Sequence, residues 1–304
     1  MKYDVIIPSS KQDISFLPKV FKYIRINLID ARKIFVITSA NNFKKLNKYL
    51  LVYGVELIDE NNLCNGLSYS SIDKILKSKG VYTRTGWHFQ QFLKMGFALS
   101  KYADEYYLSW DADTLPLSKI SFFDSENNPI FTIKKEYHKP YFNTMQNLIG
   151  LSKTANFSFI AEHMLFKSSF MKELLSEIEK SSNDGGLWFE KIINASVDLA
   201  YPGFSEFETY GTFVWVRYPG YYKTQRLNTF REAGMIKGRW IDDKSIERLS
   251  FDLDTASFEM FSNPPFPYNI PNIKATWKRR WKQVKNRSLI ELISFIISKI
   301  KKNN

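Results

Sequence analysis

The sequence contains very little cysteine and histidine. Its 304 residues include one cysteine, Cys64, and three histidines. A single cysteine cannot build a disulfide framework, which suits a reducing compartment, and the chain has no cluster of cysteines and histidines spaced for zinc. We expect Cys64 to be a buried structural thiol rather than a nucleophile.

Long apolar runs are absent as well. No stretch reaches the roughly 18 apolar residues that a membrane-spanning helix needs. The opening residues, MKYDVIIP, lack the basic region and apolar core of a signal peptide. We therefore expect a cytoplasmic protein, peripheral on the inner face of the cytoplasmic membrane. The hydrophobic content of 44% is enough for a sizeable core, either in one large α/β domain or in two fused halves.

The net charge of +12 favours polyanionic partners. Much of the positive charge lies near the C-terminus, where seven Lys or Arg fall between Lys274 and Arg287, with Trp277 and Trp281 among them. A segment of this composition, 273–304, suits an anionic membrane surface. A terminal helix packed on the core is a nearly equal alternative. A nucleic-acid-binding segment is the least favoured of the three interpretations.

Apolar runs of strand length alternate with helical periodicity in the first 110 residues. We expect strands at 5–7, 33–38, 55–58 and 105–109, and helices at 16–28, 41–51 and 86–102. This alternation predicts an α/β fold with a central, mostly parallel sheet flanked by helices. Later in the chain we expect strands at 130–133 and 164–166, helices at 168–180, 185–195 and 205–216, and a return to the sheet at 258–261.

Two acids follow the fourth predicted strand. Asp111 and Asp113 come directly after it in the run WDADT. Ligands of open α/β sheets bind beyond the carboxyl ends of the strands. Carboxylate oxygens suit Mg²⁺ or Mn²⁺, which also bind the phosphates of a substrate. A pair of acids alone is a weak signal, but its place after an apolar strand and beside Trp110 strengthens it.

Four segments, taken in order, resemble a little-characterised family of bacterial glycosyltransferases of the GT-A type. They are DVIIP at 4–8, GWHFQQFLK at 86–94, WDADT at 110–114 and SEFETYG at 205–211. The resemblance covers roughly residues 3–220. It implies a Rossmann-related, GT-A-like fold and a role in the assembly of a bacterial surface glycan: lipo-oligosaccharide, lipopolysaccharide or capsule. The GT-A-like domain would span 1–272, with a nucleotide-sugar half of about 1–120 and an acceptor half of about 121–272.

The resemblance also implies roles for residues near the acidic pair. Asp113 would ligate Mn²⁺ or Mg²⁺ directly, and Asp111 would bind the ribose or reach the ion through water. Pro8, Ser9 and Ser39 would line the nucleotide. The family often adds a late histidine ligand, but no histidine follows His163, so the third metal ligand stays open.

Three polar residues near the second segment are candidates for donor binding. Arg84 lies just before the predicted helix, whose N-terminus favours anions, and a guanidinium there could hold a diphosphate. Gln91 and Lys94 belong to the segment GWHFQQFLK. For Lys94, a place on a solvated helix face is as good an explanation as donor binding. We expect all three at a nucleotide-sugar donor, most simply a UDP-sugar.

Glu206 and Glu208 begin the predicted helix at 205–216. Ser205 with Glu208 has the spacing of a capping box, which needs no function. Glu206 is not needed for that box and could accept a proton from an acceptor hydroxyl. We expect this pair to supply the base of an inverting transfer, with Glu206 favoured.

The sequence therefore predicts a metal-dependent glycosyltransferase. Its partners would be a nucleotide sugar and a glycan or lipid-linked oligosaccharide acceptor, with no nucleic acid. The alternative is a non-catalytic nucleotide-sugar or glycan-binding module of the same fold. No phosphate-binding loop or nucleophile motif supports a nucleotide-processing enzyme of another class.

Overall fold

The computed structural model describes residues 1–270. Its central sheet has five strands in the order β3-β2-β1-β4-β7. The strands are β1 (Tyr3–Pro8), β2 (Ala31–Thr38), β3 (Val55–Asp59), β4 (Tyr106–Trp110) and β7 (His163–Lys167). The first four run parallel, and β7 pairs antiparallel with β4 at the edge. This confirms the predicted α/β class with a mostly parallel central sheet.

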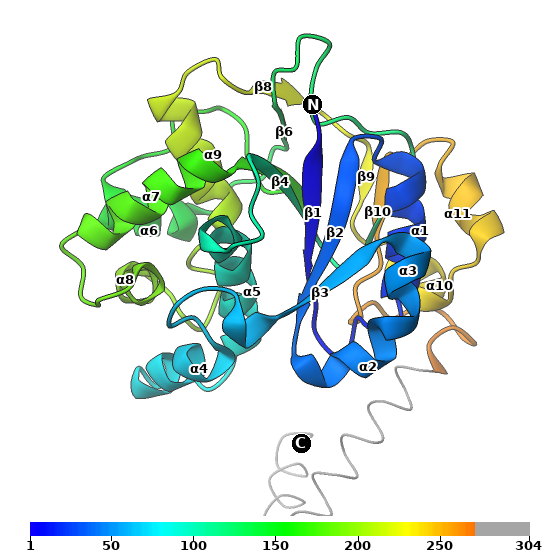
Figure 1. Cartoon of the computed structure of the whole chain (residues 1–304), viewed down its shortest axis with the longest axis horizontal. Coiled ribbons are helices and arrows are strands. Elements are labelled where there is room, and N and C mark those ends of the chain that lie inside the picture. Colours follow the sequence, from blue (N-terminus) through cyan, green and yellow to red (C-terminus); the bar gives the residue numbers. More distant parts are fainter. Residues whose placement is uncertain (271–304) are drawn as a thin grey trace, which may run out of the picture.

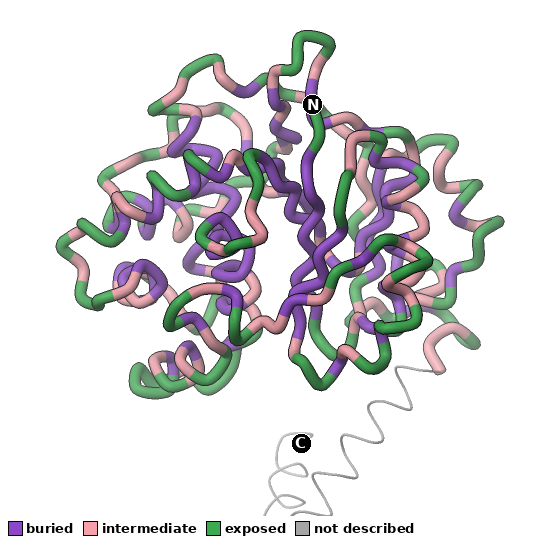
Figure 2. The backbone as a smooth tube through the Cα atoms, viewed as in Figure 1, coloured by how far each residue is buried: buried purple, intermediate pink, exposed green. Residues whose placement is uncertain are grey.

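Both faces of the sheet are covered, and alternate strand residues enter two separate hydrophobic clusters. Along β1, Ile6 belongs to one cluster, whereas Val5 and Ile7 belong to the other. All three residues are fully buried. Figure 2 shows the middle of the sheet coloured as buried. A strand buried on both faces needs a continuous apolar run, which explains why these strands are visible in the sequence.

Helices form the two outer layers (Figure 1). One layer contains α4 (Tyr69–Ser78), α5 (Thr85–Gly96), α6 (Lys139–Ile149), α7 (Ser168–Lys180), α8 (Trp188–Ala195) and α9 (Glu206–Arg217). The other contains α1 (Leu17–Asn27), α2 (Phe43–Leu46), α3 (Leu50–Tyr53) and α11 (Asp243–Leu249). Within residues 1–270, no helix combines the length and the apolarity that crossing a bilayer requires.

Two small sheets accompany the central one. β5 (Thr114–Pro116), β9 (Thr229–Phe230) and β10 (Thr255–Ser257) form a three-stranded sheet in the order β5-β10-β9. β6 (Ile130–Thr132) and β8 (Lys223–Gln225) pair in parallel. The first of these sheets brings residues near 256 next to the chain that follows Asp113, with residues near 230 one strand further away.

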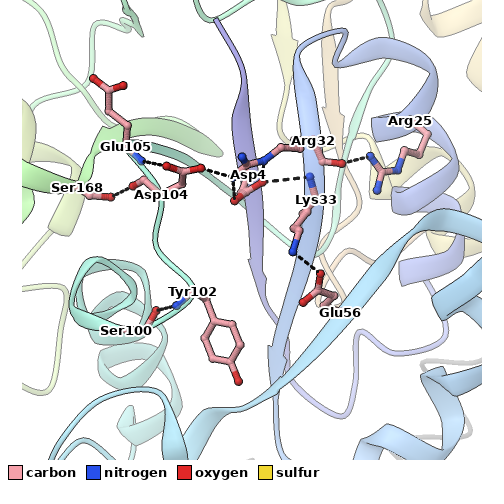
Figure 3. A network of polar contacts seen from close by, with 10 residues as sticks. All are labelled: Asp4, Arg25, Arg32, Lys33, Glu56, Ser100, Tyr102, Asp104, Glu105 and Ser168. Atoms are coloured by element: carbon pink, nitrogen blue, oxygen red, sulfur yellow. Dashed lines mark hydrogen bonds and ion pairs between the residues drawn. The ribbon is translucent and has the colours of Figure 1, made fainter.

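An ion-pair network holds together the ends of the strands that lie opposite the ligand edge of the sheet (Figure 3). The buried carboxylate of Asp4 accepts two hydrogen bonds from Arg32, at 2.9 and 2.7 Å, and one from the Lys33 amide. Arg32 also binds Asp104, at 2.5 Å, just before β4. Arg32 on β2 therefore joins Asp4 on β1 to Asp104 before β4, and the place of Asp4 in the first motif is structural.

Several predicted elements differ in the structure. The helix expected at 41–51 is a chain of short pieces, Ala40–Asn42, α2, Asn47–Tyr49 and α3, which ends at Gly54 with a φ of +60°. The strand expected at 258–261 is wrong: the strand here is β10, three residues earlier, and it belongs to the small sheet. The reason is pairing, because Ser257 is in register with Thr114.

Two long helices were not predicted. α4 begins at a Ser68–Ser71 capping box, and α6 begins at Lys139 with Pro140 in its first turn. Both are amphipathic, and in both a local start signal was present in the sequence. The basic extension predicted at 273–304 lies outside the described residues.

Candidate active site

A cavity of about 380 Å³ opens at the carboxyl ends of β1 and β2. Pro8 and Ser9 from the end of β1 line it, and so does Ser39 after β2. On its other side α5 contributes Gly86, Phe89, Gln90 and Leu93. The three residues predicted to contact the nucleotide thus share one cavity at the ligand edge of the sheet.

An aromatic ring and a carboxyl group that were not predicted from the sequence also line this cavity. Tyr69 is 46% exposed and packs edge-on against Phe89, with ring centroids 5.9 Å apart. Burial, and then the neighbouring Asp59 carboxylate, raise the pKa of Glu60 to about 7. Both residues line the cavity. The position of Glu60, directly after β3, could have indicated it.

The acidic pair is fixed by backbone hydrogen bonds to two other strands. The Asp111 amide donates to the Glu162 carbonyl oxygen at 2.9 Å, beside β7. The Phe258 amide donates to the Asp113 carbonyl oxygen at 2.8 Å, beside β10. The turn after β4 is therefore set by the tertiary structure on both sides, which limits how far the two carboxylates can move.

More carboxylates than cationic groups surround the Asp113 side chain. Burial first, and then the nearby carboxylates of Asp111, Asp13 and Glu259, raise its pKa to about 7, although the Arg239 guanidinium acts in the opposite direction. The Asp113 and Arg239 side chains are 3.9 Å apart. Such a cluster fits a cation. Within residues 1–270, however, no group of three or more His, Cys, Asp or Glu side chains is arranged to hold a metal ion.

Lys94 links the acidic pair to the first candidate base. Its ammonium lies 2.9 Å from Asp111 Oδ1 and 2.8 Å from Glu206 Oε1, and 4.3 Å from the centre of the Phe207 ring. The Lys94 and Glu206 side chains are both 6% exposed. Burial alone would lower the pKa of Lys94, but the two carboxylates outweigh it and hold that pKa above its ordinary value.

Gln91 supports the same helix start. Its Oε1 accepts a hydrogen bond from the Glu206 amide at 3.2 Å. Within the described part of the chain, its buried Nε2 has no hydrogen-bond partner. Gln91 therefore holds Glu206 through the backbone and leaves one donor unused.

Glu208 does not complete the predicted capping box. Ser205 does cap α9, because its hydroxyl accepts from the Glu208 amide at 3.3 Å. The Glu208 carboxylate, however, accepts from the Ser158 hydroxyl and from the Phe159 amide, the latter at 3.2 Å. Burial raises its pKa. The reciprocal half of the box was wrong, since a tertiary partner replaced the local one.

Two arginines occupy different surroundings. Arg84 is exposed at the N-terminus of α5 with a φ of +76°, and its guanidinium lies over the Trp87 ring. Arg239 is the guanidinium beside the acids: it donates to Asp13 Oδ1 at 2.8 Å and to the carbonyl oxygens of Gln12 and Phe258. Because Asp13 also lines the cavity, Arg239 joins the cavity to the acidic pair.

Two other reactive side chains are structural. Burial raises the pKa of the Cys64 thiol to about 11, which keeps it protonated. His163 is 1% exposed and stacks on Trp110 with ring centroids 4.9 Å apart. Burial lowers the pKa of His163 to about 4. Neither side chain is suited to nucleophilic or acid–base chemistry in this setting.

No protein-family model matches this chain, and no curated protein matches it. Among solved structures, the chain is similar to the galactosyltransferase LgtC in complex with donor and acceptor sugar analogues, at 11% identity and a TM-score of 0.42, over 84% of this chain and 86% of that one. It is also similar to mouse xyloside xylosyltransferase 1, at 12% identity and a TM-score of 0.44, over 88% of this chain and 100% of that one.

A third similar structure is the glycosyltransferase GlyE of Streptococcus pneumoniae. The identity is 12% and the TM-score 0.36, over 98% of this chain and 64% of that one. All three are glycosyltransferases. At these identities and TM-scores, the likeness does not establish an activity for this chain.

Proposed function

We propose that this chain is a metal-dependent glycosyltransferase of the GT-A type, which transfers a sugar from a nucleotide-sugar donor to a hydroxyl of a bacterial surface glycan. The observation that carries the proposal is one continuous arrangement around α5. On one side of the helix lies a cavity suited to a nucleoside, and on the other lie an acidic pair and a buried glutamate.

The cavity suits the nucleoside part of a donor such as a UDP-sugar. Its volume of about 380 Å³ falls in the range of small-molecule sites. Tyr69 offers an exposed ring for stacking, and Ser9, Ser39 and Glu60 offer polar groups for the base and ribose. The diphosphate would then extend past Asp13 toward Asp113.

Asp113, assisted by Asp111, would hold Mn²⁺ or Mg²⁺. The negative charge around Asp113 fits a divalent cation, and donor phosphates and water would complete its coordination. When bound, the ion supplies neutralisation of the charge that develops on the departing diphosphate. Arg239 lies beside the same position and can share that neutralisation once a diphosphate displaces its contact with Asp13.

Glu206 would accept the proton of the acceptor hydroxyl as that oxygen attacks the anomeric carbon. This is the role a base plays in an inverting transfer. Lys94 holds the Glu206 carboxylate in one place, 2.8 Å from its ammonium, and the same ammonium binds Asp111. The acceptor would be a lipid-linked oligosaccharide at the cytoplasmic face of the membrane.

The test is a screen of nucleotide sugars for donor hydrolysis and transfer, with Mn²⁺, with Mg²⁺ and with a chelator. We expect turnover only with metal, and we expect Asp113→Ala to abolish it while circular dichroism stays unchanged. Asp252→Ala, at an exposed acid outside this arrangement, is the control. Full turnover in chelator or in Asp113→Ala would refute metal dependence.

A second comparison separates an enzyme from a non-catalytic binding module. Glu206→Gln should bind nucleotide as the wild type does but turn over on the order of a hundredfold more slowly. If Glu208→Gln is folded and inactive while Glu206→Gln is active, Glu208 is the base. If a nucleotide sugar binds but none is hydrolysed under any condition, the chain is a non-catalytic binding module rather than an enzyme.

A further inference from the structure

Large apolar side chains are exposed together on the surface formed by residues 234–240 and 259–268. Trp240 is 57% exposed, Phe261 85% and Phe266 76%. Met235 adds a fourth, at 47%. Single exposed apolar residues are ordinary, but several large ones on neighbouring segments mark an interaction surface. We call Trp240, Phe261 and Phe266 the aromatic triad.

The two segments are packed against each other. A Cβ added at Gly234, the first residue of α10 (Gly234–Lys237), would lie 2.4 Å from the Ser262 hydroxyl oxygen, and one at Gly238 would lie 3.3 Å from Pro264. A second cavity of about 380 Å³ is lined by Trp240 together with Met260, Pro264 and Tyr268. The triad therefore belongs to one region of the surface, near α10 in Figure 1.

The positive charge of the C-terminal residues indicates which partner this surface binds. The sequence after Ile270 contains ten Lys or Arg and a single acid, Glu291. Its first basic residue, Lys274, is eight residues after Phe266. Trp is enriched at the headgroup level of a bilayer, and Trp or Phe together with Lys and Arg is typical of segments that lie in the membrane interface, where anionic lipid attracts the cations.

The surface also lies next to the candidate active site. Arg239, the residue before Trp240, lines the second cavity and reaches to 3.9 Å from Asp113. A bilayer that touched Trp240 would therefore lie beside Arg239, whose guanidinium is the neighbour of Asp113. For an enzyme acting on a lipid-linked acceptor, that is where the acceptor would be presented.

We propose that the aromatic triad docks this protein on an anionic lipid bilayer by inserting its rings at the membrane interface. The contact is apolar, so it is distinct from the electrostatic attraction expected of segment 273–304. Salt separates the two, because about 0.5 M salt screens charges beyond roughly 4 Å but leaves buried apolar contacts in place. The proposal rests on the proposed function, because it says where the transferase would meet its acceptor. Its test, however, measures vesicle binding and requires no glycosyltransferase activity.

The experiment uses the full chain and vesicles of phosphatidylglycerol and phosphatidylcholine, at low salt and at about 0.5 M salt. We expect the wild type to sediment with the vesicles at both. Trp240→Ser, Phe261→Ser and Phe266→Ser, combined, should weaken binding at high salt on the order of tenfold or more, because three rings lose their apolar contact. Tyr82→Ser, Tyr137→Ser and Tyr201→Ser, combined, is the matched control: these rings are 74%, 64% and 69% exposed.

Three outcomes would overturn the proposal. The first is wild-type binding that vanishes entirely at high salt. The second is a triad variant that unfolds at a clearly lower temperature than the wild type, which would mean that the protein's own chain covers these rings. The third is a wild-type dimer that the triad variant converts to a monomer without any change in vesicle binding. If the wild type hydrolyses no nucleotide sugar, by contrast, the proposed function is wrong, but the proposal for the aromatic triad is unaffected.

Discussion

Lys94 is a buried cation whose two partners are both candidate site residues. Its motif predicts a place at the donor, although a solvated helix face would explain a lysine there equally well. The structure places its ammonium between Asp111 and Glu206, in a position that is almost closed to solvent. A buried ion pair adds little net stability, but removing one member leaves an uncompensated charge, which is costly.

Lys94→Met should therefore lower the free energy of unfolding by about 3 kcal/mol, because Glu206 loses its counter-charge in a buried place. Adding Glu206→Gln should recover part of that loss, since the orphaned charge is then removed. Urea denaturation of the two single variants and the double variant measures this coupling.

Lys77→Met is the matched control for that cycle. Lys77 is also a helical lysine paired with an acid, Asp73, but it is exposed. Its loss should leave the free energy of unfolding almost unchanged. If Lys94→Met behaves like Lys77→Met, the bridge contributes nothing and Glu206 is not confined by it.

Glu60, which lines the cavity, should make the folding stability of the protein depend on pH. Its pKa of about 7 in the folded state exceeds the ordinary value of a glutamate near 4.5, so the folded protein resists ionising it. Folding stability should therefore be fully present below about pH 4.5 as far as this group is concerned, and should decline as the pH rises toward 7. Glu60→Gln should remove this part of the slope, as measured by urea denaturation at pH 5 and pH 7.5. An unchanged slope would mean that Glu60 titrates normally.

At the scale of elements, α5 divides its residues between two environments. Gly86, Phe89, Gln90 and Leu93 line the cavity, whereas Gln91 and Lys94 contact Glu206. Helical geometry turns successive residues by about 100°, so one helix can serve both places. This explains why a contiguous motif, GWHFQQFLK, contains residues of two kinds.

Gly86 tests the cavity side of α5. A Cβ added there meets nothing within 4 Å, and the residue lines the cavity. Gly86→Leu should leave stability unchanged or slightly higher, because a helical glycine is replaced, but it should weaken binding of uridine diphosphate by about tenfold or more by filling the cavity. Isothermal titration calorimetry measures the affinity.

Gly96, in the same helix, supplies the opposite case. A Cβ there would lie 3.0 Å from Cys64 Sγ and 3.4 Å from Leu67 and Trp188. Gly96→Ala should lower stability without changing uridine diphosphate affinity, since Gly96 does not line the cavity. If Gly86→Leu leaves the affinity unchanged, the nucleotide binds elsewhere.

At the scale of the whole molecule, two contributions to membrane binding can be separated. A chain that ends at Ile270 loses the ten basic residues that follow and keeps the aromatic triad. We expect it to unfold at the same temperature as the full chain and to lose the salt-sensitive part of vesicle binding. Its binding at about 0.5 M salt should match that of the full chain. A large fall in unfolding temperature would show instead that segment 271–304 packs on the core.

The sequence by itself determined the strands of the central sheet and the position of the acidic pair. β1, β2, β3 and β4 were predicted within a few residues. For β1 and β4 the reason is that a parallel strand buried on both faces must be a continuous apolar run. The pair at Asp111 and Asp113 followed from β4 alone. Pro8, Ser9 and Ser39 were implied by the family resemblance, and the structure places them in one cavity at the ends of β1 and β2, which share one edge of the sheet.

Only the tertiary structure decided which side chains meet at that edge. Lys94 and Glu206 are separated by more than a hundred residues, and so are Asp113 and Arg239. No local periodicity encodes such contacts, because they depend on how the helices and the small sheet pack on the central one. Glu208 shows the same limit. Its spacing from Ser205 predicted a local cap, but its buried carboxylate accepts from the Ser158 hydroxyl and the Phe159 amide instead, which packing brings within reach.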